Sequence, residues 1–323
     1  MLEMIHDIQI GNYKLGLLQS VEIHKSVDLL ADTAVIVVPG VVYNQSLDIE
    51  DKVKTGDAVR IAFGYDDSVI VEFEGFLQRI DTDDSSLTFN CEDGMFLMRK
   101  PVADRELKNT TVKAIAEYLL EAPSNSPSGG GFTLNCTYDI TYEKFVIKNA
   151  NAFDVLQKLQ DDTKANIYMN GNELNIHPAY VEKGGDVYYD FALNIESSDL
   201  KYRSTDDRKF EVAVEGIGLD GKRKTVTVGT TGGEKRTVKV FNVMDDAALK
   251  KRGEEELKYL SYDGYEGSIT GWLVPYAEPT FSAHIHDREY EYKTGSYYVV
   301  SVTTTFSESG GARKVELGRK VSN

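Results

Sequence analysis

The chain has 323 residues, enough for two or three domains, and 41% of them are hydrophobic, which is ordinary for a globular protein. Its formal net charge is −16, and a surface of this sign repels phosphate, so tight nucleic-acid binding is excluded as its main activity. No run of about 18 apolar residues is present, and the start lacks the basic and apolar regions of a secretion signal. We therefore expect no transmembrane helix and no export.

Residues 1–100 predict a first β-barrel domain. Short alternating or fully apolar runs separated by Gly, Pro and Asp favour strands near residues 8–13, 17–23, 34–38, 59–63, 69–80 and 87–91. In the run 69–80 the apolar side chains change from odd positions (Val71, Phe73) to even ones (Phe76, Ile80). We expect a β-bulge or sharp bend at Gly75, where the change falls.

Residues 101–185 predict an inserted α/β region. Asn109–Thr111 can cap a helix, and a second helix begins near Asn151. The face of the first helix has the spacing i, i+3, i+4, i+7, i+8, given by Val112, Ile115, Ala116, Leu119 and Leu120. The dipeptide Asn170-Gly171 between two strand patterns predicts a hairpin.

Residues 186–323 predict a second β-barrel domain that carries one helix at about 245–260. Asp220-Gly221 favours a further hairpin. Along the helix, the stripe from Leu249 to Leu260 should pack on the second barrel. The pairs Lys250/Glu254, Lys251/Glu255 and Arg252/Glu256, spaced i, i+4, should form its solvated face.

The two ends of the chain resemble each other in pattern, though not in identity. Residues 59–91 and 281–318 each favour three or four strands joined by tight turns, with a glycine midway. Two copies of one module in a chain allow a ring of three chains to approach six-fold symmetry.

Three segments carry a resemblance to a known family. Asn151–His177 is similar to a helix that leads into a hairpin, Val53–Asp57 to the turn before the first barrel's coupling strands, and Gly295–Val302 to the closing strands of the second barrel. In these segments and in domain order, the chain resembles the hub proteins of phage tail baseplates. These include the late control protein D family, the tail hub of Mu-like phages and the hub-like N-terminal part of VgrG spikes.

The resemblance implies a mainly β fold of the α+β type, with two similar barrels flanking a small α/β region. It also implies a homotrimeric ring, without enzymatic activity or cofactor, that joins a six-fold tail tube to a three-fold spike and lets DNA pass without specific binding. The expected partners are the tube protein, the spike protein and other baseplate proteins of a phage, a prophage or a related contractile injection machine. The protein would be made and assembled in the bacterial cytoplasm and reside in the virion tail. Because the sequence ends soon after the second barrel, the puncturing device should be a separate chain.

Two other functions stay open. A glycan- or receptor-binding tail module predicts a concave aromatic groove, and a carbohydrate-active enzyme predicts a cleft with two converging carboxylates. Adjacent acids such as Asp161 and Asp162 are common in this acidic chain, and nothing singles out a catalytic pair. No Gly-x-Ser-x-Gly motif is present.

His284 and His286 are the candidate metal ligands, since they alternate on a predicted strand and share one face. Asp287 and Glu289 are near in sequence, but zinc sites require three or four ligands. A hydrogen-bonded pair without metal is the simpler interpretation. The two cysteines, Cys91 and Cys136, form no disulfide framework and are interpreted as small apolar residues.

A group of aromatic residues surrounds the helix at 245–260 and is the candidate subunit interface. Aromatic residues are enriched at interfaces, but they also pack inside barrels with their hydroxyl groups at the rim. Barrel packing, a subunit interface and sugar binding all stay open. The candidate interface residues are Tyr259, Tyr262, Tyr265, Trp272 and Tyr276.

Overall fold

The structure is a computed structural model that describes residues 3–42, 45, 46, 49, 51–66, 68–83, 85–121, 131–138, 140–291 and 294–322. It is mainly β, as predicted. The chain forms two compact units. The first joins Met1–Phe96, Gly184–Leu200 and Glu266–Asn323, and the second joins Leu97–Lys183 and Lys201–Tyr265. The segment predicted as the third domain therefore contributes to both units.

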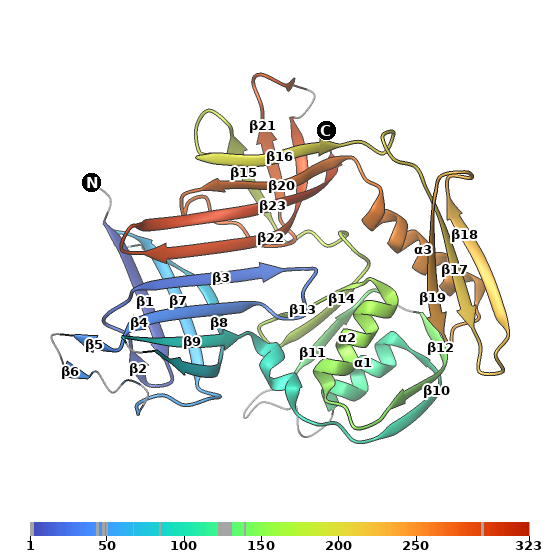
Figure 1. Cartoon of the computed structure of the whole chain (residues 1–323), viewed down its shortest axis with the longest axis horizontal. Coiled ribbons are helices and arrows are strands. Elements are labelled where there is room, and N and C mark those ends of the chain that lie inside the picture. The colour runs from blue at the N-terminus through green and yellow to red at the C-terminus, as the bar shows by residue number, and fades with distance from the viewer. Residues whose placement is uncertain are drawn as a thin grey trace. The chain divides into compact units, whose positions relative to one another are not determined.

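The first unit contains two groups of strands, here called the N-module and the C-module (Figure 1). The N-module comprises β1 (Met4–Ile10), β2 (Tyr13–Lys14), β3 (Ser20–Ser26), β4 (Thr33–Pro39), β5 (Val41–Val42), β6 (Gln45–Ser46), β7 (Ala58–Tyr65), β8 (Ser68–Thr82) and β9 (Ser86–Glu92). A 3-10 helix, η1, follows at Gly94–Arg99. The C-module comprises β15 (Asp186–Asp190), β16 (Ser197–Arg203), β20 (Gly264–Gly271), β21 (Ser282–His286), β22 (Gly295–Ser307) and β23 (Gly310–Ser322). Residues 201–203 of β16 and 264–265 of β20 are counted with the second unit.

The two modules repeat one strand order. In the N-module the sheet runs β3-β4-β9-β8-β7-β1, and in the C-module it runs β16-β20-β23-β22-β21-β15. Apart from the short strands β2, β5 and β6, the strands that fill corresponding places in the two orders follow one another in the same succession along the chain. The predicted likeness of the two ends is therefore confirmed, and it extends over six strands rather than three or four.

The repeat holds at the level of single residues. The β8–β9 hairpin has a register shift between Leu77 and Arg79, and the β22–β23 hairpin has a matching shift between Val299 and Ser301, besides two more between Ser296 and Val299. The expectation of a bulge at Gly75 is wrong, because Gly75 pairs regularly with Val59; the register of β8 shifts at Glu72 against β7 and at Gln78 against β9. Gly75 has another role: a Cβ there would lie 2.3 Å from the carbonyl oxygen of Glu92.

The modules differ at their last strand and in one connection. β1 pairs with β7 antiparallel, whereas the shorter β15 pairs with β21 parallel. The short turn 27–32 joins β3 to β4, but the matching connection from β16 to β20 contains three strands and a helix of the second unit.

The N-module and C-module are joined through a continuous sheet. β22 pairs with β3 antiparallel from Ser301–Ser26 to Ser307–Ser20. Phe306 of β22 stacks on Phe63 with ring centroids 4.5 Å apart, and it belongs to the hydrophobic core of the N-module. Burying a phenylalanine side chain stabilises the fold by about 1.5–3 kcal/mol. The junction is therefore part of the hydrophobic core.

A buried ion pair also crosses this junction. The guanidinium of Arg313 (β23) donates to both carboxylate oxygens of Glu72 (β8), at 2.7 and 3.0 Å. The same guanidinium donates to the carbonyl oxygen of Leu273 at 2.9 Å and lies over the ring of Tyr276. Both charged side chains are almost completely buried.

The second unit begins with an α/β region. β10 (Arg105–Thr111) pairs with β12 (Thr141–Ile147), and β11 (Thr133–Cys136), β14 (Glu173–His177) and β13 (Asn166–Asn170) form a three-stranded sheet. Helix α1 is Val112–Glu121, with the predicted face buried, and Thr111 accepts a hydrogen bond from the backbone of Ala114. Helix α2 is Ala152–Thr163, capped by Asn151.

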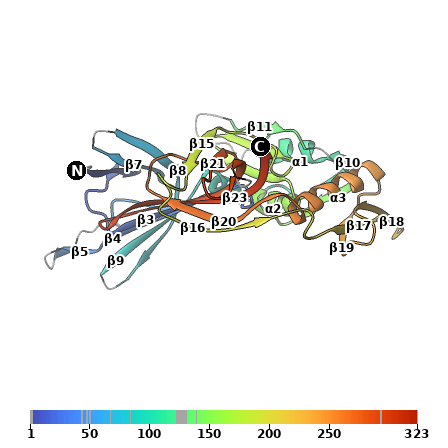
Figure 2. The same cartoon turned by 90° about the horizontal axis from the view of Figure 1, so that it is seen from above.

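The rest of the second unit is a sheet of β18 (Arg223–Gly229), β17 (Phe210–Ile217) and β19 (Glu234–Phe241), joined by the predicted Asp220-Gly221 turn. Helix α3 (Asp246–Leu260) lies along this sheet (Figures 1 and 2). Gly253 lies against Val214 and Val228. The helix therefore packs on strands of the predicted segment 186–323, but these strands form a sheet separate from that of the C-module.

The expected solvated face of α3 is also partly buried. Arg252 donates from Nε to the carbonyl oxygen of Asp162 at 2.7 Å, and Glu255 accepts a hydrogen bond from the backbone of Ala179 at 3.0 Å. An i, i+4 charge pattern is the same whether the helix faces water or polar backbone, so the pattern alone did not distinguish the two. Within the described residues, no helix is long and apolar enough to span a membrane.

Candidate functional site

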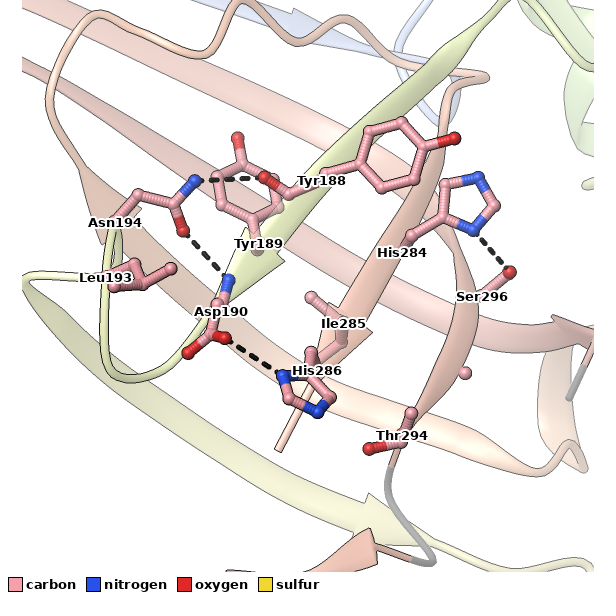
Figure 3. A pocket seen from close by; sticks show the side chains of 11 residues that line it. Tyr188, Tyr189, Asp190, Leu193, Asn194, His284, Ile285, His286, Thr294 and Ser296 are labelled. Carbon is pink, nitrogen blue, oxygen red and sulfur yellow. Dashed lines mark hydrogen bonds and ion pairs between the residues drawn. The ribbon is translucent and has the colours of Figure 1, made fainter. Parts of the chain in front are cut away.

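A pocket of about 480 Å³ lies in the C-module beside β15 and β21 (Figure 3). Its lining combines the aromatic Tyr188, the apolar Leu193 and Ile285, and the polar Asp190 and His286. All of its lining residues belong to the first unit. Its volume is within the range of small-molecule sites, about 300–1,000 Å³.

The parallel pairing of β15 with β21 places the polar groups of the pocket. It sets Tyr188 opposite His284 and Asp190 opposite His286, on one face of the sheet. The Tyr188 and His284 rings stack with centroids 4.6 Å apart. The Nδ1 atom of His286 lies 2.9 Å from a carboxylate oxygen of Asp190, and Arg288 donates to the same oxygen at 3.2 Å.

These contacts control the charge of Asp190. The hydrogen bond from His286 contributes most, and the backbone N–H of Ala192 and the Arg288 guanidinium add to it; together they lower the pKa of Asp190 to about 2. Asp190 is therefore a carboxylate throughout the physiological pH range.

The candidate metal ligands His284 and His286 do share one face, but each has a carboxylate partner on β15. His284 uses both ring nitrogens, Nε2 at 2.7 Å from Asp186 and Nδ1 at 2.8 Å from the hydroxyl of Ser296. Asp287, which is near in sequence, instead accepts hydrogen bonds from the backbone of Glu289 and Tyr290. In the part of the chain that the structure describes, no three His, Cys, Asp or Glu side chains are grouped closely enough to hold a metal.

Ser296, His284 and Asp186 form a hydrogen-bonded chain of the residue types found in serine hydrolases. Ser296, however, is only 6% exposed, so its hydroxyl does not face a substrate. The chain holds the His284 ring in place beneath Tyr188.

The five aromatic candidates for a subunit interface do not form one group. Tyr259, Tyr262 and Tyr265 belong to the second unit, and Trp272 and Tyr276 to the first. Tyr265 is buried and contacts Tyr202 edge to face, while Tyr262 lies beneath Arg203. Tyr276 lies beneath Arg313 and donates a hydrogen bond to Glu278. Tyr259 and Trp272 are 53% and 60% exposed, so these two stay candidates for a contact with another chain.

A second polar group, in the N-module, was not predicted from the sequence. The carboxylate of Asp32 accepts a hydrogen bond from the backbone of Ser26, and that of Asp93 accepts one from the backbone of Asp32. Burial raises the pKa of Asp32 to about 7 and the pKa of Asp93 well above its ordinary value. Single acids in turns are too common to predict such a pair.

The fold is that of phage tail proteins. A tail protein from Neisseria meningitidis has 15% identity and a TM-score of 0.68, with 97% of this chain and 96% of that one covered. The 43 kDa tail protein of prophage MuSo2 from Shewanella oneidensis has 15% identity, a TM-score of 0.67 and 98% of each chain covered. An Escherichia coli component of the type VI secretion system has 9% identity and a TM-score of 0.60, with 98% and 79% covered. At these identities the likeness shows the fold alone. No protein-family model and no curated protein matches the sequence.

Proposed function

We propose that this protein is a structural component of a phage tail baseplate or of a related contractile injection machine. In this proposal three copies form a hub ring that joins a six-fold tail tube to a three-fold spike and leaves a central passage. Its fold, shared with tail proteins and a type VI secretion component, supports this role. The role is not enzymatic, and the partners are the tube, the spike and other baseplate proteins.

The observation that carries the proposal is the six-strand repeat with its internal junction. Within one chain, β22 of the C-module pairs with β3 of the N-module. The counterpart of β22 is β8, and the counterpart of β3 is β16. β16 is an end strand of the sheet, and in the described residues Arg79–Thr82 of β8 pair only with β9. Each chain thus has one free edge of each kind.

The same pairing between copies would close a ring. β16 of one copy would add to the free edge of β8 in the next, as β3 adds to β22 within the chain. Three copies would then present six similar modules. Free strand edges are otherwise an aggregation hazard, so the chain benefits from covering these two.

The repeat also predicts which residues meet between copies. His24 lies opposite Thr303 at the internal junction, and their side chains contact at 3.0 Å. The hydrogen bonds Gln19 N to Val37 O and Glu196 N to Thr270 O align β3 with β16, so Lys201 is the counterpart of His24. The shared bulge makes Asp81 the counterpart of Thr303. Lys201 and Asp81 should therefore form an ion pair between copies.

The acidic character of the chain supports a passage for DNA. Three copies carry three times the formal charge of −16, and phosphate makes few adhesive contacts with such a surface. A basic inner wall in a structure of the assembled ring would contradict this part of the proposal.

The mass in solution, measured by light scattering over a range of concentrations, tests the ring. We expect three times 36.0 kDa. Lys201→Glu and Asp81→Lys should each weaken the trimer, and the double exchange should restore it. Glu74→Lys, an exposed charge in the β7-paired half of β8, is the matched control and should leave the mass unchanged. A monomer at every concentration, with fast amide exchange in both β16 and residues 79–82, would overturn the proposal.

A further inference from the structure

The pocket of the C-module exists because the repeat is broken there. In the N-module, β1 runs antiparallel to β7 and covers its full length, but the shorter β15 runs parallel to β21. The counterparts of His284 and His286 in the N-module are Arg60 and Ala62, by the register of the two hairpins. The pocket and its side chains are therefore not needed for the fold of a module, which the other copy achieves without them.

The pocket leaves an aromatic and an apolar side chain exposed to water, which is unfavourable for the free protein. Tyr188 is 68% exposed, and Leu193 at the rim is 70% exposed. The stack on His284 covers one face of the Tyr188 ring and holds it in place. Such an arrangement suits a ligand that packs C–H groups on a fixed aromatic ring, with little side-chain entropy lost on binding.

The polar groups beside Tyr188 are arranged for hydroxyl groups rather than for a charged ligand. Asp190 already contacts His286 and Arg288, and Asp186 already contacts His284, so both carboxylates are engaged by protein groups before a ligand binds. A carboxylate has about four acceptor sites, so Asp190 can still accept from a ligand hydroxyl. His286 uses Nδ1 for Asp190 and leaves Nε2 for a ligand.

We propose that this pocket binds a neutral saccharide ring, packed against Tyr188 and hydrogen-bonded by Asp190 and His286. A hexopyranose combines an apolar C–H face with a rim of hydroxyl groups, which matches this division into an aromatic wall and a polar wall. The pocket lies within one unit, so the inference does not depend on the ring or on its oligomeric state.

Calorimetric titration of the full chain with glucose, galactose and N-acetylglucosamine tests the proposal. We expect at least one of these sugars to bind saturably at millimolar concentration. Tyr188→Ala and His286→Ala should each weaken that binding about tenfold, which is the loss expected for one stacked ring or one good hydrogen bond. Tyr259→Ala removes a tyrosine that is also more than half exposed but lies far along the chain, on α3, and should leave binding unchanged.

Two results would overturn the proposal. The first is the absence of saturable binding by all three sugars to protein whose circular dichroism shows it to be folded. The second is preferential binding of inorganic phosphate over all three sugars, because this would assign the pocket to an anion. Neither result bears on the mass measurement that tests the ring.

Discussion

The N-module and the C-module share a strand order and a bulge position, yet they use the shared positions differently. Leu87, a core residue of β9, has Arg313 as its counterpart in β23, and Gly75 has the buried Tyr297. The backbone pairing is therefore what the two modules have in common, while the side chains that fill each position have diverged. The differences gather at the junction between the modules and at the pocket, where each module meets something the other does not.

The largest expected effect comes from breaking the buried ion pair between Glu72 of the N-module and Arg313 of the C-module. Arg313→Met leaves the Glu72 carboxylate buried without its partner and should lower the free energy of unfolding by about 3–5 kcal/mol. Urea unfolding followed by circular dichroism measures this loss. Arg79→Met removes an exposed arginine paired with Asp81 on the same strand β8 and should cost about 1 kcal/mol or less.

The double variant Glu72→Leu/Arg313→Met sharpens this test. Because it removes both charges, it should recover most of the stability that the single variant loses. If the single variant and the double variant were equally unstable, the loss would come from packing rather than from an unpaired charge.

The next effect concerns Gly75, where the C-module has a tyrosine. Gly75→Ala places a Cβ 2.3 Å from the carbonyl oxygen of Glu92 and 2.8 Å from the ring of Phe73. We expect a loss of about 1–3 kcal/mol in the free energy of unfolding, the usual cost of overpacking. Gly16→Ala, with no atom within 4 Å of the added Cβ, is the control and should be close to neutral.

One acid in each module should make the free energy of unfolding depend on pH, and the two should act in opposite directions. The first is Asp32 of the N-module. Its pKa is raised to about 7, mainly by burial, and nearby Glu278 raises it further while Lys25 opposes the shift. Its stabilising contribution is therefore complete below the unfolded pKa of about 4 and is lost as the pH rises through about 7. In urea unfolding at several pH values, the free energy of unfolding of Asp32→Asn should rise relative to that of the wild type as the pH rises. A difference that is independent of pH would contradict the raised pKa.

The smallest effect concerns Asp190 of the C-module, where the pKa is lowered to about 2. The stabilising contribution of this group is present above the unfolded pKa of about 4 and is lost as the pH falls through about 2. The stability that Asp190→Asn loses relative to the wild type should therefore shrink as the pH falls between these two values. Lys222 lowers the pKa of Asp220 in the β17–β18 turn of the other unit. The stability of Asp220→Asn should therefore depend on pH in the same direction.

The sequence predicted what depends on local patterns. The capped helix after Asn151, the Asn170-Gly171 turn and the buried face of α1 follow from spacing and turn chemistry, and the structure confirms them. The repeat was visible because both hairpins keep their alternation of apolar residues.

What the sequence could not predict depends on partners that are distant along the chain. Glu72 and Arg313 are separated by 241 positions, and each on its own resembles an ordinary surface charge in a strand. The pocket requires β15 to pair parallel with β21, and strand direction leaves no mark on the alternation of residues. His284 and His286 could be placed on one face, but their carboxylate partners on β15 could not be found.

The connection between β16 and β20 indicates how the chain evolved. Its counterpart in the N-module is a six-residue turn, 27–32, so the simplest history is the duplication of one module, followed by the insertion of a foldable segment into the turn of the second copy. A turn that once accepted about sixty residues is a position where the chain tolerates added mass. The tip of turn 27–32, where Leu29 is exposed, is therefore a natural place to attach a cargo domain to this protein.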